Sequence, residues 1–270
     1  MTVAGTSRPL RRNNVTVSGN PAGPTLMFAH GFGCSQEAWD LVAPQFESDF
    51  MVVLFDHVGA GGSDSSSYDR HKYGSLDGYA SDVLEIQEAL GASDLVFVGH
   101  SVSAMIGVLA ANLAPERFRA LVLVSPSPRY INDDGYVGGF EPADIAALLD
   151  SLDANYLDWS RNTAPVIMGT PDRPELEDRL TDSFCRVDPQ NAGHFARVTF
   201  TSDNRDDLAR VPVPALVLQT REDAIAPPEV GRYVHNAIPG SHYAELDTTG
   251  HVPILSAPDA VVTHIRRFLS

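Results

Sequence analysis

The sequence of 270 residues has little lysine, cysteine or positive charge, and each shortage excludes a class of protein. Lys72 is the only lysine and Tyr73 follows it, so the chain has no Gly-Lys-Ser/Thr phosphate-binding loop. Cys34 and Cys185 are the only cysteines, which excludes a disulfide scaffold and a cysteine-rich zinc site. The net charge of −16 repels phosphate backbones and anionic lipids, so we expect no nucleic-acid partner and no membrane partner.

Long apolar segments are also missing. The most apolar window, 95–114, is interrupted by Gly99-His100-Ser101 and is typical of a strand followed by a helix, not of a membrane span. Residues 1–12 include basic side chains but no apolar run after them, so we expect no signal peptide. These observations together predict a cytoplasmic protein.

Short apolar runs alternate along the chain with segments of helical periodicity. In the segments 76–90 and 102–113, apolar residues recur every three or four positions, as in amphipathic helices. Continuous apolar runs suit strands that are buried on both faces of a parallel sheet. The alternation therefore predicts an α/β fold with right-handed crossovers. Seven runs are predicted to be strands: 15–17, 25–29, 50–55, 95–98, 120–124, 215–219 and 243–246.

The stretch from about 130 to 203 breaks this alternation. It has no strand signal, but at three places proline follows a polar residue directly ahead of apolar residues at helical spacing, which is typical of a helix start. We therefore expect a core domain formed by residues 1–129 and 204–270, with residues 130–203 as a helical insertion between two strands. The three predicted helix starts are Glu141-Pro142, Arg173-Pro174 and Asp188-Pro189.

The strongest local motif joins a predicted strand to a predicted helix at Ser101. Small residues on both sides of a serine allow a sharp turn that exposes its hydroxyl and directs the helix N-terminus at the reacting oxygen. The usual pattern is G-x-S-x-G, and here Gly99 and Ser103 occupy the two outer positions. A serine at the last position is still small enough for close packing. The motif predicts a nucleophile, and the alternative is an idle serine in a tight turn.

A nucleophilic serine needs a base, and that base needs a carboxylate to orient it. Asp223 follows the predicted strand 215–219, and His251 follows the predicted strand 243–246. Both lie in loops at strand ends, on the edge of a parallel sheet that would also hold Ser101. Glu222 is the rival carboxylate. The order Ser, acid, His predicts a catalytic triad of Ser101, Asp223 and His251.

Glycine-rich turns admit two further interpretations. The segment 30–33 follows a predicted strand, and it would place the Phe32 amide beside the Val102 amide as an oxyanion hole. A dinucleotide-binding G-x-G-x-x-G motif fails, because Gln36 and Asp64 stand where its last glycine is needed. The remaining histidines lack metal-ligand spacing. We therefore expect no cofactor and no metal site.

Several segments together resemble the α/β-hydrolase superfamily, among them HGFGCSQEAW (30–39), FVGHSVSAMIG (97–107) and VSPSPRYINDDGYVGGF (124–140). In combination they resemble the subfamily of the bacterial stress-response regulator RsbQ, to which plant strigolactone and karrikin receptors also belong. The plant receptors resemble the GHSVS form of the motif, so Ser103 is ordinary in that comparison.

The resemblance implies an α/β-hydrolase fold with a mostly parallel, eight-stranded sheet and a four-helix lid formed by residues 130–203. Ser101, Asp223 and His251 match the triad of the family, and Phe32 and Val102 match its oxyanion donors. The resemblance also implies a small apolar pocket between lid and triad. Its expected lining is drawn from the lid aromatics, which could instead form the core of the lid: Phe140, Trp159, Phe195 and Phe200.

Three functions are compatible with these features. The first is a cofactor-independent serine hydrolase that acts on a small hydrophobic ester or lactone. The second, implied by the resemblance to RsbQ, is a sensor that processes a small hydrophobic ligand and regulates a partner phosphatase. The third is a binding protein without turnover, which is disfavoured because all three triad positions are intact. A serine at position 101, where an aspartate would be needed, argues against haloalkane-dehalogenase and epoxide-hydrolase chemistry.

Overall fold

The computed structural model describes residues 7–270, and a mostly parallel sheet runs through the middle of the chain. Its seven strands are ordered β1-β3-β2-β4-β5-β6-β7, and only β1 runs antiparallel to its neighbour β3. The strands are β1 (Thr16–Gly19), β2 (Thr25–Ala29), β3 (Met51–Phe55), β4 (Leu95–His100), β5 (Phe118–Val124), β6 (Ala215–Glu222) and β7 (His242–Thr249). The prediction about a signal peptide in residues 1–12 lies partly outside the described residues.

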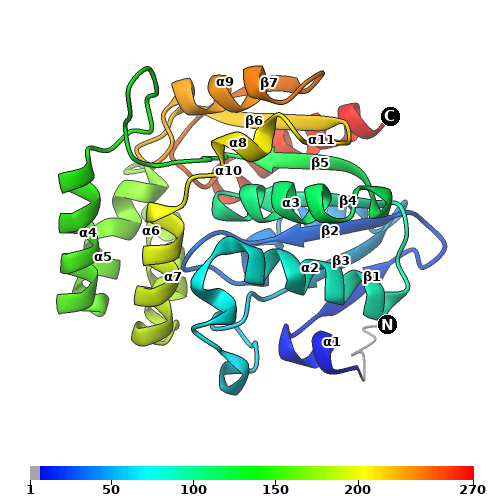
Figure 1. The fold of residues 1–270 in the computed structure, drawn as a ribbon, viewed down its shortest axis with the longest axis horizontal. Coiled ribbons are helices and arrows are strands. Elements are labelled where there is room, and N and C mark those ends of the chain that lie inside the picture. The colour runs from blue at the N-terminus through cyan, green and yellow to red at the C-terminus, as the bar shows by residue number, and fades with distance from the viewer. Residues whose placement is uncertain (1–6) are drawn as a thin grey trace.

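Helices cover the sheet and extend beyond one of its ends. The helices α2 and α3 lie against the face turned to the viewer in Figure 1, and α4 to α7 stand together at the left end. The longer helices of the core are α2 (Leu76–Leu90), α3 (Val102–Leu113), α9 (Pro228–Ala237) and α11 (Pro258–Leu269). Shorter helices are α1 (Arg8–Arg12), α8 (Arg205–Leu208) and α10 (Pro253–Ser256). No helix among residues 7–270 has the length and apolar character needed to cross a membrane.

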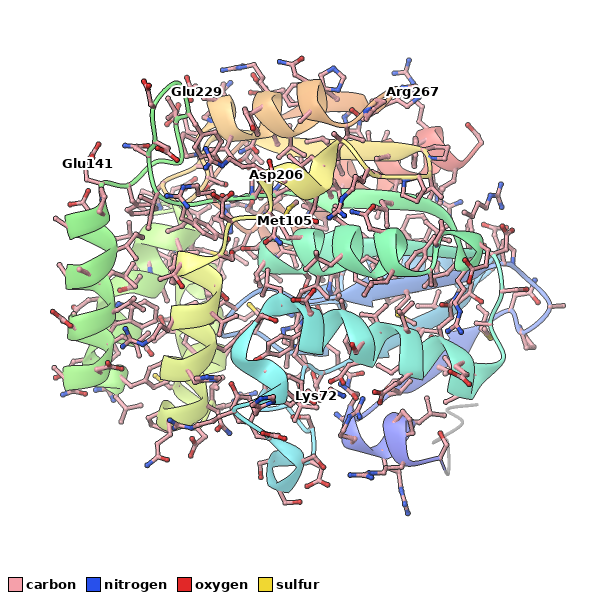
Figure 2. The ribbon with its side chains drawn as sticks, viewed as in Figure 1. Lys72, Met105, Glu141, Asp206, Glu229 and Arg267 are labelled. Carbon is pink, nitrogen blue, oxygen red and sulfur yellow. The ribbon has the colours of Figure 1, made fainter. Side chains whose placement is uncertain are left out.

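The core lies between the sheet and these helices. Every residue of the central strands β2 and β4 is buried, as expected for strands covered on both faces. Met105 of α3 is fully buried, whereas Glu229 of α9 and Arg267 of α11 reach solvent (Figure 2). The apolar runs of the sequence thus form the centre of the sheet, and the charged residues lie on its covering helices.

All seven strands predicted from apolar runs are present, and this corrects the eight strands implied by the family resemblance. Within the described part of the chain, the segment ahead of the edge strand β1 forms α1 and not a further strand. Pro9 lies in the first turn of α1, where its ring favours a helix start and its missing amide proton costs nothing. Arg12 ties this helix to Asp82 and Glu85 of α2 through ion pairs of 2.8 and 2.6 Å.

Residues 125–214 connect β5 to β6 although these two strands are neighbours in the sheet. The segment holds four longer helices and no strand, in agreement with its predicted helix starts. They are α4 (Pro142–Ala154), α5 (Tyr156–Met168), α6 (Pro174–Cys185) and α7 (Pro189–Thr201). The helix α5 packs on α6, and α4 packs on α7. Because β5 leads directly into this segment, the four helices stand at the carboxyl end of the parallel strands (Figure 1).

Candidate active site

Ser101 lies in the sharp turn between β4 and α3 that the sequence predicts. Its backbone angles are φ 57° and ψ −125°, a conformation that residues other than glycine adopt only under strain. The Ser101 amide donates to the carbonyl of Val124 at 2.8 Å, which helps to hold the turn in place. A Cβ atom at Gly99 would lie 2.4 Å from the carbonyl oxygen of Ser103, so the turn requires glycine there.

His251 and Asp223 complete a chain of hydrogen bonds that begins at Ser101. The distance from Ser101 Oγ to His251 Nε2 is 2.7 Å, and that from His251 Nδ1 to Asp223 Oδ2 is also 2.7 Å. An ionised carboxylate only accepts hydrogen bonds, so Nδ1 carries the ring proton and Nε2 accepts from the serine hydroxyl. The other carboxylate oxygen, Oδ1, accepts from the amides of Ile225 and Ala226 at 2.8 and 3.0 Å. The arrangement therefore prepares Ser101 to lose its proton to His251.

The three side chains are nearly inaccessible to solvent, with exposed fractions of 5% for Ser101, 8% for Asp223 and 4% for His251. Glu222, the rival acid, has an exposed side chain at the end of β6, and only its backbone carbonyl approaches the site. That carbonyl accepts from the Gly250 amide at 2.8 Å. The structure thus brings Asp223 to the histidine and leaves Glu222 in solvent.

The loop that carries His251 is attached to the end of α5. The His251 amide donates to the carbonyl of Ile167 at 2.8 Å, and Thr249 Oγ1 donates to the carbonyl of Gly169 at 2.8 Å. Gly250 has φ 84°, and a Cβ atom there would lie 1.9 Å from the carbonyl oxygen of Met168. The inserted helices therefore contribute directly to the position of the histidine.

The predicted oxyanion donors lie beside Ser101. A Cβ atom at Gly31 would lie only 3.2 Å from Ser101 Cβ, so the loop after β2 passes directly over the serine. Within residues 7–270, neither the Phe32 amide nor the Val102 amide donates a hydrogen bond to another group. The Val102 amide also belongs to the first turn of α3, where the helix dipole favours negative charge. Both amides are therefore free to bind an oxyanion.

An apolar cavity opens from Ser101 toward the inserted helices. It leaves about 30 Å³ of space for a water-sized molecule, so the site is narrow in this conformation. Its wall residues come from the end of β4, from the segments that follow β2, β4, β5, β6 and β7, and from the helices α5, α6 and α7. They are Phe32, Cys34, His100, Ser101, Tyr130, Ile167, Leu180, Phe184, Thr199, Phe200, Ile225, His251 and Val252.

Of the four lid aromatics proposed from sequence, only Phe200 lines this cavity. Trp159 and Phe195 instead contact the ring of Phe32, with centroid distances of 6.1 and 5.8 Å. Phe140 is not among the wall residues; its amide donates to the Tyr130 carbonyl at 3.1 Å, and its backbone pairs with Ile131.

Two aromatic wall residues, Tyr130 and Phe184, were missed. Phe184 stacks on Trp159 at 5.8 Å, and Tyr130 contacts Phe200 at 5.1 Å. In the sequence, Leu176, Leu180 and Phe184 recur at a spacing of four, which indicates a shared apolar helix face but not what that face contacts.

Burial changes the acid–base character of several groups around the site. Desolvation lowers the pKa of His100 to about 3, and the ring donates from Nε2 to the His251 carbonyl at 2.8 Å. Desolvation likewise raises the pKa of the Cys34 thiol to about 12. Both groups are therefore neutral at neutral pH and add no charge to the cavity. Among the described residues, no cluster of three or more His, Cys, Asp or Glu side chains could hold a metal ion.

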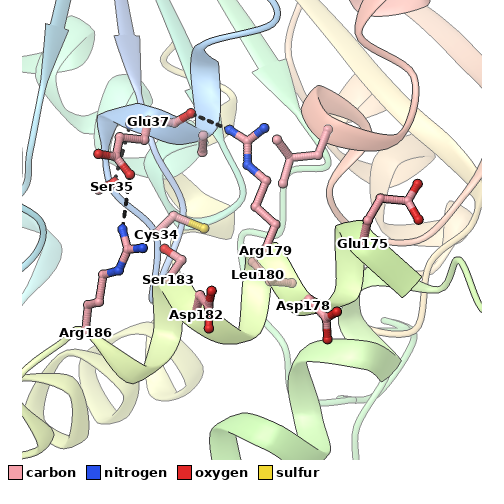
Figure 3. Close-up of a pocket in the computed structure, with 12 residues that line it drawn as sticks. Cys34, Ser35, Glu37, Glu175, Asp178, Arg179, Leu180, Asp182, Ser183 and Arg186 are labelled. Carbon is pink, nitrogen blue, oxygen red and sulfur yellow. Dashed lines mark hydrogen bonds and ion pairs between the residues drawn. The ribbon is translucent and has the colours of Figure 1, made fainter. Parts of the chain in front are cut away.

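A second pocket of about 360 Å³ lies on the other side of Cys34 and Leu180, which line both spaces (Figure 3). It separates α6 from the 3₁₀ turn Gln36–Trp39. Arg179 donates to the Glu37 carbonyl at 2.8 Å, and Arg186 pairs with the Glu37 carboxylate at 3.4 Å. These contacts fasten α6 to the segment that follows the oxyanion loop.

Comparisons with known proteins agree with this geometry. A family described as alpha/beta hydrolase fold matches residues 24–258. The chain is 39% identical to a strigolactone esterase from Arabidopsis thaliana over 258 residues, which cover 95% of this chain and 96% of the relative. It is 37% identical to a karrikin insensitive receptor from Petunia hybrida over 247 residues, or 91% of this chain and 90% of the relative. A solved structure of a hydrolase from Oleispira antarctica superposes with a TM-score of 0.94 at 38% identity, covering 97% of this chain and 96% of the other. The chain belongs to the alpha/beta hydrolase family.

Proposed function

We propose that this protein is a cofactor-independent serine hydrolase that cleaves a small hydrophobic ester or lactone. The observation that carries the proposal is the hydrogen-bonded chain from Ser101 through His251 to Asp223, with 2.7 Å at each step. The free amides of Phe32 and Val102 beside the serine support it. The similarity to proteins named esterases points in the same direction.

The geometry assigns one role to each group. Ser101 Oγ attacks the acyl carbon and passes its proton to His251 Nε2, while Asp223 accepts from Nδ1 and stabilises the imidazolium that forms. The amides of Phe32 and Val102 donate to the oxyanion of the tetrahedral intermediate. His251 then protonates the leaving alkoxide, which leaves an acyl group on Ser101. In the second half, His251 takes a proton from water as the water oxygen attacks the acyl carbon. His251 then returns that proton to Ser101 Oγ as the ester bond to the serine breaks, which releases the acid and restores the enzyme.

We also propose that residues 130–203 act as a lid over this site. Pockets for drug-sized ligands usually have volumes of about 300–1,000 Å³, whereas the space above Ser101 is about 30 Å³. Substrate binding therefore requires the lid helices to move, and it favours compact acyl groups or lactones over long chains. Phe32, Phe184 and Phe200 are the aromatic walls that such a substrate meets.

The decisive experiment replaces the nucleophile. We expect Ser101→Ala to remain folded and to lose at least about a thousandfold in the hydrolysis of p-nitrophenyl acetate. Ser160→Ala is the matched control, because it removes a fully buried hydroxyl whose bond stays within α5. Wild-type protein treated with a fluorophosphonate should gain one adduct, located at Ser101 by mass spectrometry. Retained turnover in Ser101→Ala, or an adduct elsewhere, would disprove the proposal.

A second candidate is a sensor, as in RsbQ-like signalling, and the similarity to a chain named a receptor favours it. In this role the protein would process a hydrophobic ligand once and then regulate a partner phosphatase. Pre-steady-state kinetics on a panel of esters, enol-lactones and butenolides separates the two roles. Repeated turnover after a burst supports the metabolic enzyme, whereas a single turnover that changes the activity of an added phosphatase supports the sensor. A cytoplasmic location stays a prediction from sequence.

A further inference from the structure

A second serine–histidine contact lies two residues after Ser101, at Ser103, and the proposed reaction does not use it. Ser103 Oγ lies 2.7 Å from His57 Nε2 and 2.5 Å from the carbonyl oxygen of His30. Ser103, His57 and His30 are all fully buried. In addition, His30 Nε2 accepts from the His57 amide at 3.1 Å, and His30 Nδ1 lies 2.8 Å from the carbonyl of Gly31. The three residues thus form a closed ring of hydrogen bonds.

The direction of each bond in this ring follows from the acceptors. The His30 carbonyl can only accept, so the Ser103 hydroxyl donates its proton to it. The Ser103 oxygen must then accept from His57, which places the ring proton of His57 on Nε2. Because its proton is committed to a carbonyl and it has no solvent exposure, Ser103 is not a second nucleophile. Its hydroxyl instead connects α3 to the loop that follows β2.

This loop carries the oxyanion donor. His30 precedes Gly31 and Phe32, so the carbonyl held by Ser103 lies two residues before the Phe32 amide. The Phe32 ring contacts four aromatic rings of the proposed lid at centroid distances of 5.8 to 6.1 Å. Movement of the lid would therefore tend to displace the loop that carries Phe32. The loop therefore needs an attachment to the core that does not depend on the lid.

We propose that Ser103 is a positioning residue for the oxyanion hole: oriented by His57, its hydroxyl fixes the His30 carbonyl and thereby holds the Phe32 amide beside Ser101. The proposal rests on the proposed function, since it assigns Ser103 a role in stabilising the transition state of that reaction. It explains why the outer position of the G-x-S-x-G pattern carries a hydroxyl here, which a glycine could not supply.

The test compares Ser103→Ala with His57→Phe. The first variant removes the bond to the His30 carbonyl. The second keeps an aromatic ring against Phe55, Tyr79 and Phe195 but removes both ring nitrogens. Of these two nitrogens, only Nε2 has a hydrogen-bond partner among the described residues. For each folded variant, kcat and KM are measured with p-nitrophenyl butyrate, together with the inhibition constant of an alkyl boronic acid. The boronic acid forms a tetrahedral adduct whose oxygen occupies the oxyanion hole.

Losing one oxyanion donor costs about 10²–10³ in kcat, and misplacing it should cost less. We expect Ser103→Ala to lower kcat about 10- to 100-fold and to raise the inhibition constant of the boronic acid by a similar factor. KM should change less than about threefold. His57→Phe should lower kcat by at least about threefold, and the Ser160→Ala control should stay within about twofold of wild type.

Two results would overturn the proposal. One is a folded Ser103→Ala variant whose kcat and boronic acid affinity stay within about twofold of wild type. The other is a rise in KM alone, which would mean that Ser103 shapes the pocket and not the donors. If Ser103→Ala does not fold, an unchanged kcat in His57→Phe refutes the proposal. Failure of the proposed function is seen separately, as turnover retained in Ser101→Ala.

Discussion

Three buried histidines around the site predict that the protein loses stability as the pH falls from about 7 to 5. Desolvation lowers the pKa of His100 to about 3 and lowers the pKa of His57 well below its ordinary value of 6.5. Desolvation also lowers the pKa of His30, against the attraction of Asp56. In the unfolded chain these groups bind protons below about pH 6.5. The unfolded state therefore binds more protons than the native state, and the free energy of unfolding falls with the pH.

The size of the effect follows from the value for His100. When the pKa of a group drops from 6.5 to about 3 on folding, the free energy of unfolding falls by about 2 kcal/mol between pH 7 and pH 5. The fall from pH 7 reaches about 3 kcal/mol at pH 4. His57 and His30 add to this loss in the same direction. Small proteins are stable by about 5–15 kcal/mol, so the loss is a large share of the total.

Urea unfolding followed by the fluorescence of Trp39 and Trp159 at about pH 7, 6 and 5 measures this slope. His100→Gln keeps a side-chain donor for the His251 carbonyl but has no group that titrates in this range. The free energy of unfolding of this variant should therefore depend less steeply on pH, by the equivalent of about one bound proton. Ile86→Val is the control, since loss of one buried methylene should lower the free energy of unfolding equally at every pH. A wild-type change below about 0.5 kcal/mol over this range would refute the reasoning.

Three other predictions concern the site itself. Asp223→Asn should lower kcat by about 10⁴-fold because His251 would lose the orienting carboxylate. Glu222→Gln is the control, and it should change steady-state kcat less than about twofold because the Glu222 side chain is exposed. Equal losses of kcat in the two variants would contradict the assignment of Asp223 as the acid. Iodoacetamide at about pH 8 should alkylate Cys185 and spare the buried Cys34, whose pKa is raised to about 12, as peptide mass spectrometry would reveal. Trp159→Ala should loosen the ring cluster against Phe32 and raise kcat/KM for octanoate relative to acetate esters. An unchanged dependence of kcat/KM on chain length would mean that Trp159 only packs among the inserted helices and does not limit the substrate.

The sheet was predictable from sequence because strands buried on both faces appear as continuous apolar runs. The ends of the strands were harder to predict. The strands β6 and β7 continue to Glu222 and Thr249, beyond the predicted ends at 219 and 246, and these two residues pair with each other. Backbone pairing does not require apolar side chains, so polar strand ends leave no signal in composition.

The candidate triad was predictable because each member follows a strand end, where the topology of a parallel sheet gathers loops. The cavity wall was not, because it depends on how α5, α6 and α7 are rotated about their axes. Periodicity indicates which side of a helix is apolar, but not whether Trp159 meets substrate or another ring. The role of the Ser103 hydroxyl was equally hard to predict, because the motif requires only a small residue there. Its partners His30 and His57 follow β2 and β3 and are distant in sequence.

The attachment of His251 to the end of α5 limits how this protein can be engineered. Helical insertions are attractive segments to exchange between related enzymes when a new substrate range is wanted. This insertion, however, supplies the acceptor for the His251 amide at Ile167 and a close contact between Met168 and Gly250. A chimera joined at the ends of residues 130–203 would place a foreign helix terminus against His251. Successful grafts should therefore keep the native segment around 167–169 and exchange only the helices before and after it.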